Sequence, residues 1–239
     1  MQSYEFERQM GIALSKDREY FPAEIIGINP DVDLAAAEDV WDAGGNYTFS
    51  AAAAAHFISS SHAGDTQEFE VKGLDANWVE QAVSVTAAGQ TKTAITGTFI
   101  RILSVRNTGA AQQGDVYVYE DDVVVAGVPT TATKVRAKSI LANNQSRMGI
   151  YSIPADRTGL LLKWDGNLVK AFDGTLEVWI REFGGAFALY DTMYLLQEYL
   201  PRVLSIPKVL NTKCDVKLRF TATADNTVAR AGMNILLRK

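Results

Sequence analysis

The sequence predicts an all-β protein made of two β-sandwich or jelly-roll-like units, preceded by an irregular N-terminal arm. Three observations predict this class. Over residues 213–220 every second residue is apolar and the residues between are charged, which is the period of a strand with one buried face. Similar short runs recur along most of the chain, separated by Gly, Asp and Asn turns. Their spacing is typical of sandwiches and small barrels.

The first β unit is expected at residues 38–130. The alanine run at 51–55 favours a helix by propensity but is too short to hold one alone, so an extended segment is slightly favoured. A central strand is expected at 99–105, because this run is apolar on both faces apart from Arg101 and Ser104. The other strands expected here are 68–72, 78–86, 91–96, 115–120 and 123–126.

The second β unit is expected at residues 131–239, after a connection at about 127–147 that contains Pro129 and Asn143-Asn144. Asp173-Gly174 predicts a tight hairpin turn, since both residues tolerate positive φ. A closing hairpin is expected around Asp225-Asn226. The expected strands are 148–153, 160–164, 168–172, 175–183, 186–192, 213–221 and 228–237.

Residues 1–37 differ from the rest, because aromatic side chains stand among charges and prolines interrupt the segment. Two interpretations remain open. The segment is either an irregular start that packs on its own domain, or an arm that lies across a neighbouring subunit. In the second case Tyr4, Phe6, Tyr20 and Phe21 would be the anchors of the interface.

Composition excludes several classes of function. The net charge is −5 and basic residues form no cluster, so nucleic-acid binding is not expected. No run approaches the roughly 20 apolar residues of a membrane span, and the charged start does not resemble a signal peptide. Cys214 is the only cysteine, so no intrachain disulfide can form, and its place on the apolar face of a strand predicts a buried side chain.

The sequence offers no reaction centre, and we expect no catalytic, cofactor-binding or metal-binding residues. His56 and His62 have no carboxylate or cysteine at ligand spacing. The oxygen-bearing residues at 29, 31 and 33 resemble a fragment of a calcium loop, but a turn in which Asn29 and Asp31 cap the backbone is favoured. The four tryptophans could stack sugars, although core positions are favoured for them: Trp41, Trp78, Trp164 and Trp179.

Several motifs together resemble a family of virion structural proteins from tailed bacteriophages, common in marine and cyanobacterial phages. Each motif is mostly a turn beside a strand, and their shared order carries the likeness. It covers residues 38–239 and leaves residues 1–37 outside. In chain order the motifs are Asp39-Val40-Trp41-Asp42-Ala43-Gly44-Gly45, Gly73-Leu74-Asp75-Ala76-Asn77, Gly97-Thr98-Phe99-Ile100-Arg101, Tyr151-Ser152-Ile153-Pro154-Ala155, Arg181-Glu182-Phe183-Gly184-Gly185-Ala186-Phe187, Asp215-Val216-Lys217-Leu218-Arg219 and Ala224-Asp225-Asn226.

The resemblance implies a non-enzymatic structural protein of the virion, assembled in the host cytoplasm. It implies a capsid decoration or cement protein on the outer surface of the head. The expected partners are the major capsid protein or other virion proteins, and a homo-oligomer, with a trimer favoured. A neck, tail or receptor-binding spike or fibre is the alternative, and a carbohydrate-binding β protein is a more distant one. The segment 183–187 is expected to be structural, because paired glycines allow close backbone approach between two aromatics.

Overall fold

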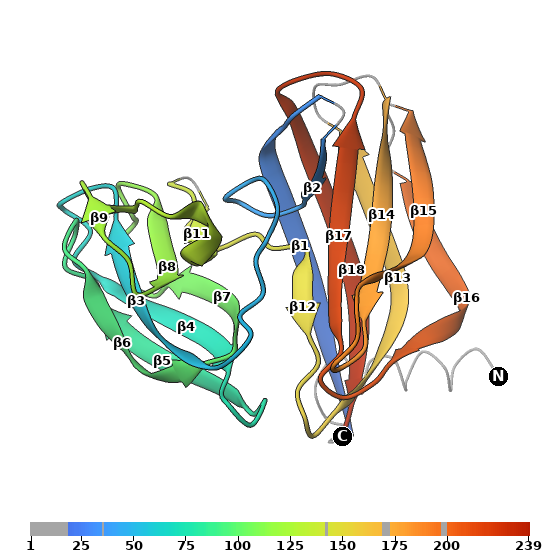
Figure 1. Cartoon of the computed structure of the whole chain (residues 1–239), viewed down its shortest axis with the longest axis horizontal. Helices are drawn as coiled ribbons and strands as arrows, with labels where there is room; N and C mark the ends of the chain where they lie inside the picture. The colour runs from blue at the N-terminus through green and yellow to red at the C-terminus, as the bar shows by residue number, and fades with distance from the viewer. Residues whose placement is uncertain (1–18, 35, 142, 169–172, 197–199) are drawn as a thin grey trace.

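The computed structural model describes residues 19–34, 36–141, 143–168, 173–196 and 200–239. Within these ranges the chain consists almost wholly of β-strands, and the one helical element is a short 3-10 helix, η1 (Ala132–Lys134). The predicted all-β class is confirmed. Figure 1 shows two β units side by side, a smaller one at the left and a larger sandwich at the right.

The larger unit, here called the large sandwich, has two antiparallel sheets. One sheet has the order β1 (Tyr20–Val32), β18 (Thr227–Arg238), β13 (Thr158–Leu168) and β16 (Leu200–Leu210). The other has the order β12 (Ile150–Ser152), β17 (Asp215–Ala222), β14 (Asp173–Arg181) and β15 (Ala188–Leu196), and β2 (Ala37–Asp39) also pairs with β17.

The smaller unit, here called the small unit, is inserted between β2 and β12. One of its sheets has the order β11 (Val135–Ser139), β8 (Val116–Glu120), β3 (Ala54–Ser60) and β6 (Thr93–Phe99). The other has the order β5 (Glu80–Thr86), β4 (Glu68–Leu74) and β7 (Arg101–Asn107). A short ribbon pairs β9 (Val124–Val125) with β10 (Val128–Pro129).

Each unit buries its own apolar core, because alternate side chains of its strands point inward. Along β14 the buried residues Leu176, Val178 and Ile180 alternate with partly exposed polar and aromatic ones. The large sandwich packs these against residues such as Trp164 and Phe220. A separate cluster, which includes Ile58, Phe69, Phe99 and Val105, fills the small unit. Two cores mean that the units are stabilised separately and must then be held to each other.

The pairing of strands divides the chain differently from the expected ranges. Residues 20–32, placed in the N-terminal arm, form β1 and pair with β18 of the same chain. Residues 135–139, placed in the second unit, form β11 and pair with β8 of the small unit. Both differences have one cause: the small unit is an insertion, so the large sandwich draws its strands from both ends of the chain.

One predicted turn is wrong. Asp173 and Gly174 lie within β14, opposite Leu196 and Leu195 of β15. The glycine is needed for packing, because a Cβ at this position would overlap the ring of Phe220. The closing hairpin is confirmed, with Asn226 at a φ of 55° between β17 and β18. Ala54 and Ala55 are extended and open β3, so the alanine run does not form a helix.

The two possible N-terminal truncations should behave differently. Deletion of residues 1–37 removes β1, uncovers β18 and strips Phe21, Ala23 and Ile25 from the core of the large sandwich. Each large apolar side chain contributes about 1.5–3 kcal/mol, against a total stability of about 5–15 kcal/mol, so this variant is expected to unfold. Deletion of residues 1–18 should leave a folded β protein. Circular dichroism and thermal melting check both, and a cooperative melt of the longer deletion near the full-length temperature would contradict the assignment of β1.

Candidate functional site: the junction between the two units

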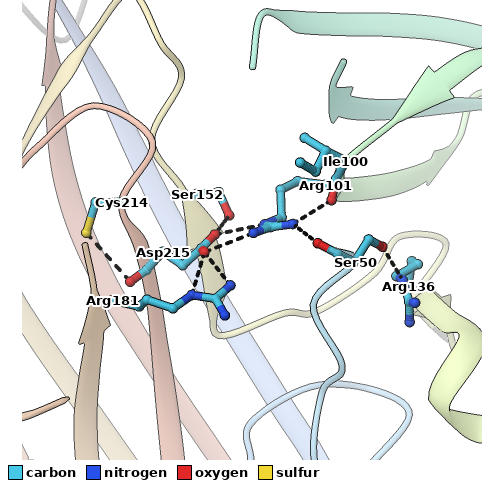
Figure 2. Close-up of polar contacts among 8 residues, drawn as sticks. All are labelled: Ser50, Ile100, Arg101, Arg136, Ser152, Arg181, Cys214 and Asp215. Atoms are coloured by element: carbon cyan, nitrogen blue, oxygen red, sulfur yellow. Dashed lines mark hydrogen bonds and ion pairs between the residues drawn. The ribbon is translucent and has the colours of Figure 1, made fainter. Parts of the chain in front are cut away.

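The junction is centred on the carboxylate of Asp215, at the start of β17. Arg101, the first residue of β7 in the small unit, donates from Nε to Oδ1 at 2.9 Å and from Nη2 to Oδ2 at 3.0 Å. Arg181, at the end of β14, donates to Oδ2 from Nε at 3.0 Å and from Nη2 at 2.6 Å. Ser152 of β12 donates its hydroxyl proton to Oδ1. Figure 2 shows these groups converging from both units.

Arg101 is almost wholly buried, and each part of its guanidinium group has a partner. Besides Asp215, Nη1 donates to the carbonyl oxygens of Ser50 at 2.8 Å and Ile100 at 2.7 Å. The guanidinium carbon lies 4.7 Å from the ring centre of Trp78 and 5.1 Å from that of Phe49. A buried cation is tolerable only when it is paired and hydrogen-bonded, and Arg101 meets both conditions.

The aromatic residues of the 183–187 turn extend this contact. Gly184 adopts a φ of 76°, and the amide of Gly185 bonds the carbonyl oxygen of Glu182, which closes a tight turn after β14. The turn places Phe183 edge-on to Trp78 at 5.7 Å and Phe187 against Phe49 at 5.1 Å. The glycines therefore serve a turn that presents two aromatics to the small unit, which agrees with the structural role expected for this segment.

Trp78 itself is held by a second turn. Its φ is 64°, and the carboxylate of Asp75 accepts bonds from the amides of Asn77 at 2.8 Å and Val79 at 3.0 Å. Positive φ at a bulky residue costs roughly 1–3 kcal/mol, and here the cost is offset by burial of the indole between Arg101 and Phe183.

The two chain segments that join the units run side by side. Trp41 and Met148 form an isolated antiparallel β-bridge. Beside it, the amide of Asp42 donates to the carbonyl oxygen of Arg147 at 3.1 Å, and the amide of Arg147 donates to Asp42 Oδ2 at 2.8 Å. The link between the units is therefore a pair of hydrogen-bonded segments rather than a single linker. Two bonded segments resist bending better than one.

Buried charges also fix the first of these segments. Asp39 accepts from the ammonium group of Lys217 at 2.9 Å, and Arg219 lies 3.4 Å away. Burial raises the pKa of Asp39 and lowers that of Lys217, in each case against the attraction between them. Burial likewise raises the pKa of Asp42 to about 7, because the amide of Arg147 and nearby cations compensate only part of the lost hydration.

The chemistry of the junction is that of a fixed contact. The Asp215 carboxylate accepts five hydrogen bonds, all from side chains of this chain, and two guanidinium groups share its charge. Its lone pairs are thus committed to holding the units together. A hollow of about 340 Å³ lies beside the pair, lined by Trp78, Phe183 and Lys213 among others.

The four residues predicted at an interface have different outcomes. Tyr4 and Phe6 lie outside the described residues. Tyr20 and Phe21 lie in β1 opposite Arg238 and Leu237. Phe21 packs against the core of its own sandwich, and the guanidinium group of Arg157 lies over its ring at 4.8 Å. Its ring is thus already used within the chain.

The other residues singled out from the sequence are mostly structural. Cys214 is buried, and burial raises the pKa of its thiol to about 12. Burial lowers the pKa of His56 to about 4, whereas His62 is exposed in a loop. The turn expected at residues 29–33 is not formed at Asn29 and Asp31, which lie in β1 where its register with β18 shifts; there Asn29 Oδ1 accepts from the amide of Asp31 at 3.0 Å. Three of the tryptophans are buried, and Trp179 is partly exposed.

Sequence reasoning missed the Arg101–Asp215 pair, whose members are separated by 114 positions. The sequence did mark one member of the pair, because Arg101 is the one charged residue in the otherwise apolar run 99–105. The sequence did not mark Asp215, because this residue occupies a charged position of an alternating strand, where a solvent-exposed side chain is expected. The small unit covers that face, and this is what buries it.

The described ranges hold neither a metal-binding cluster nor a membrane-spanning helix. In these ranges no three His, Cys, Asp or Glu side chains are grouped so that they could hold a metal ion. Nor does any helix there have the length and hydropathy to cross a membrane.

Comparison with known proteins gives no family. No family model matches the chain, and no curated protein does. Among solved structures, the chain is similar to a chain in the structure of infectious bursal disease virus Gt strain (TM-score 0.21, 9% identity) and to one in the structure of the Gx strain (TM-score 0.24, 9% identity). A third is the VP2 subviral particle of that virus (TM-score 0.21, 8% identity). Each match covers 92% of this chain and 72% of the other. TM-scores this low do not establish a common fold and carry no argument about function.

The buried pair can be tested by neutralising its acid. Asp215→Asn keeps the shape but leaves the buried Arg101 guanidinium without a counter-charge, and breaking such a pair costs about 3–5 kcal/mol. Urea unfolding should show this loss. Glu70→Gln is the matched control, because Glu70 pairs with a largely exposed Arg106 at 3.2 Å and its loss should cost less than about 1 kcal/mol. Equal effects of the two substitutions would contradict the role assigned to Asp215.

Asp42 should make stability depend on pH. Its pKa is raised from 3.8 to about 7 on folding, so the folded state holds the proton more tightly than the unfolded state. Its contribution is therefore fully present below about pH 4 and is lost as the pH rises through 7. Between pH 5 and pH 8 the loss is about 2–3 kcal/mol.

Asp42→Asn should remove that part of the pH dependence. The measurement is the difference in unfolding free energy between variant and wild type at pH 5 and at pH 8, which cancels the other titrating groups. The difference should favour the variant by about 2–3 kcal/mol more at pH 8 than at pH 5. An equal difference at both values would show that Asp42 titrates normally.

Proposed function

We propose that this chain is a non-enzymatic structural protein of a virion, a decoration or cement protein that binds the outer surface of the head of a tailed bacteriophage. Its partner is the major capsid protein, and it acts as a homo-oligomer, for which a trimer is favoured. It is assembled in the host cytoplasm.

The observation that carries the proposal is where the motifs of the phage-family resemblance lie. They are spread from residue 39 to residue 226, yet most of them meet at the junction. Arg101 ends one motif, Ser152 lies in another, and Arg181 and Asp215 open two more. The motif at 73–77 forms the turn before Trp78, and that at 39–45 contains Asp39, the partner of Lys217. The Ala224-Asp225-Asn226 motif lies apart, in the β17–β18 hairpin.

This convergence favours a role that requires the two units to keep a fixed position relative to each other. Turns scattered along a sequence by chance would have no reason to share one buried cluster. A fixed junction makes two sandwiches act as one rigid block, which can bridge neighbouring subunits of a shell without losing conformational entropy at an internal hinge. Buried apolar area on binding contributes roughly 25 cal/mol per Å², less the costs of association.

Charge and cysteine content fit the same role. A net charge of −5 suits an outer surface better than contact with packaged DNA. With one buried cysteine, the chain is held by packing and ion pairs rather than disulfides, which suits assembly in a reducing compartment. The carbohydrate-binding alternative loses its main motive, because Trp41, Trp78 and Trp164 are buried and unable to stack on a sugar.

Location and copy number test the proposal. Antibody-gold labelling of purified particles should decorate the whole head, and quantitative mass spectrometry should give a copy number comparable with that of the major capsid protein. Labelling confined to the neck or the tail tip, with few copies, would replace decoration by the neck, tail or spike alternative. Absence from purified particles would refute a virion role altogether.

A further inference from the structure

A second cleft lies between the two units, and we call it the interunit cleft. None of its lining residues belongs to the hollow beside the Arg101–Asp215 pair. Its volume is about 590 Å³, within the range of about 300–1,000 Å³ that is typical of ligand-binding sites. One wall is formed by residues 21–26 of β1, the edge strand that faces the small unit in Figure 1. Residues of β4, β5 and β7 form the other wall, and the segment 145–151 lines the space between them.

The interunit cleft offers apolar surface from both units. Ile25 of β1 and Leu103 of β7 are half-buried, and Met148 of the connecting segment is buried. Apolar side chains in a concave surface bind the apolar part of a ligand, and a few polar groups set its orientation. Pro22 lies in the same edge strand and has no N–H donor, which disfavours the addition of a regular strand to β1. Recognition in the cleft therefore depends on side chains.

Cations outnumber carboxylates in the interunit cleft, although the whole chain carries a net charge of −5. The charged residues that line the cleft are Lys72, Arg147 and Arg157 with Glu24 and Glu80. Arg157 and Glu80 are already paired, because Arg157 Nη1 lies 3.2 Å from Glu80 Oε2. Lys72 and Arg147 then face the single carboxylate of Glu24. A cleft with an excess of one charge raises the local concentration of oppositely charged ligands.

Arg147 has hydrogen-bonding capacity that the chain does not use. Its Nε–H is buried and meets no acceptor among the described residues. The contact with the Asp42 carboxylate uses the backbone amide of Arg147, so it does not supply this acceptor. A buried donor without an acceptor costs free energy, and a carboxylate can satisfy a guanidinium group through two parallel hydrogen bonds. A ligand carboxylate is the group that fits here.

Lys72 provides a second cation, on the wall of the small unit. It lies opposite Ser104 in the ladder of β4 and β7, so the two side chains share the face of the sheet that lines the cleft. Lys72 Nζ is 3.9 Å from Glu70 Oε1, and the same oxygen atom is 3.2 Å from Arg106 Nη2. One carboxylate shared between two partly exposed cations holds Lys72 only loosely. Lys72 is thus able to bind a second carboxylate of a ligand.

We propose that the interunit cleft binds an extended acidic segment of another protein. Carboxylate side chains of the segment pair with Arg147 and Lys72, and apolar side chains between them pack on Ile25, Leu103 and Met148. Successive side chains of an extended segment point to opposite sides, so one segment can present both kinds of group. A small anion would leave the apolar surface uncovered, and an apolar ligand would leave the cations unpaired. This inference goes beyond the proposed function and does not rest on it, because it requires an acidic partner and no virion.

Peptide binding tests the class of ligand. The probe is a capped, fluorescently labelled heptapeptide, Gly-Glu-Leu-Glu-Leu-Glu-Gly, and the matched peptide has Gln in place of each Glu. In fluorescence anisotropy at low salt the acidic peptide should bind saturably and at least tenfold more tightly than the neutral one. The absence of saturable binding, or equal affinity of the two peptides, would overturn the proposal. Displacement of the peptide by an equal concentration of inorganic phosphate would also overturn it, because the site would then recognise a bare anion.

Substitutions test where the peptide binds. Arg147→Gln should weaken binding at least tenfold, and Ser104→Trp should abolish it by filling the cleft without removing a charge. Lys92→Gln is the matched control, because it removes one positive charge outside the cleft, from a partly exposed side chain that pairs with Asp121 at 2.5 Å. This control should leave the affinity unchanged, and circular dichroism should show that all three variants are folded. Equal weakening by Arg147→Gln and Lys92→Gln would indicate nonspecific attraction and overturn the proposal, as would unchanged binding to Ser104→Trp.

Hydrogen exchange and light scattering provide independent measurements. The bound peptide should slow exchange of amides in residues 21–26 and 145–151 and leave β15 unchanged. Slower exchange confined to other segments would place the peptide elsewhere and overturn the proposal. Light scattering of the protein alone tests a second copy as the occupant. A wild-type oligomer that Arg147→Gln dissociates would show that the cleft is filled by another copy of this chain, which would also overturn the proposal.

Discussion

The structure depends on one buried ion pair between two separately packed β units. Arg101 and Asp215 are each nearly inaccessible to solvent, and they belong to different sheets in different units. Two sandwiches with separate cores gain little from touching unless the contact is specific. A bidentate guanidinium–carboxylate pair supplies that specificity through its planar geometry, even where its net contribution to stability is small. The aromatic rings of Trp78 and Phe49 exclude water from it and hold the guanidinium plane.

The insertion of the small unit explains why the junction needs such reinforcement. Two connecting segments cross between the units, and each is bound to the other and to the large sandwich. The amide of Val40 donates to the carbonyl oxygen of Leu218, and its carbonyl oxygen accepts from the amide of Gly149. The amide of Asp42 donates to the carbonyl oxygen of Arg147, whose amide donates to the Asp42 carboxylate. The charges buried there, Asp39 with Lys217 above all, are costly to desolvate and are offset by mutual pairing. A rigid link between the units fits the shell-binding role proposed above, because a flexible link would lose conformational entropy on binding.

Edge strands define the other side of the large sandwich. The β12 and β2 side is closed by the connecting segments, whereas the β15 and β16 side ends in exposed apolar residues. Two prolines and a bulge interrupt β16, whereas β15 has one bulge and no proline. Exposed apolar residues at the edge of a sheet favour association with another chain.

The sequence by itself determined the fold class, most strand positions and the burial of Cys214, because the period of two and the turn residues are local signals. It also marked Arg101 as unusual within its strand. The prediction from the sequence failed at Asp173-Gly174: the glycine is required because a Cβ there would overlap the ring of Phe220 on a neighbouring strand, and it forms no turn. Only the tertiary structure decided that β1 belongs with β18, that the small unit is an insertion, and that Asp215 meets Arg101. These are contacts between distant parts of the chain, and strand periodicity fixes which face of a strand is buried but carries no information about which partner covers it.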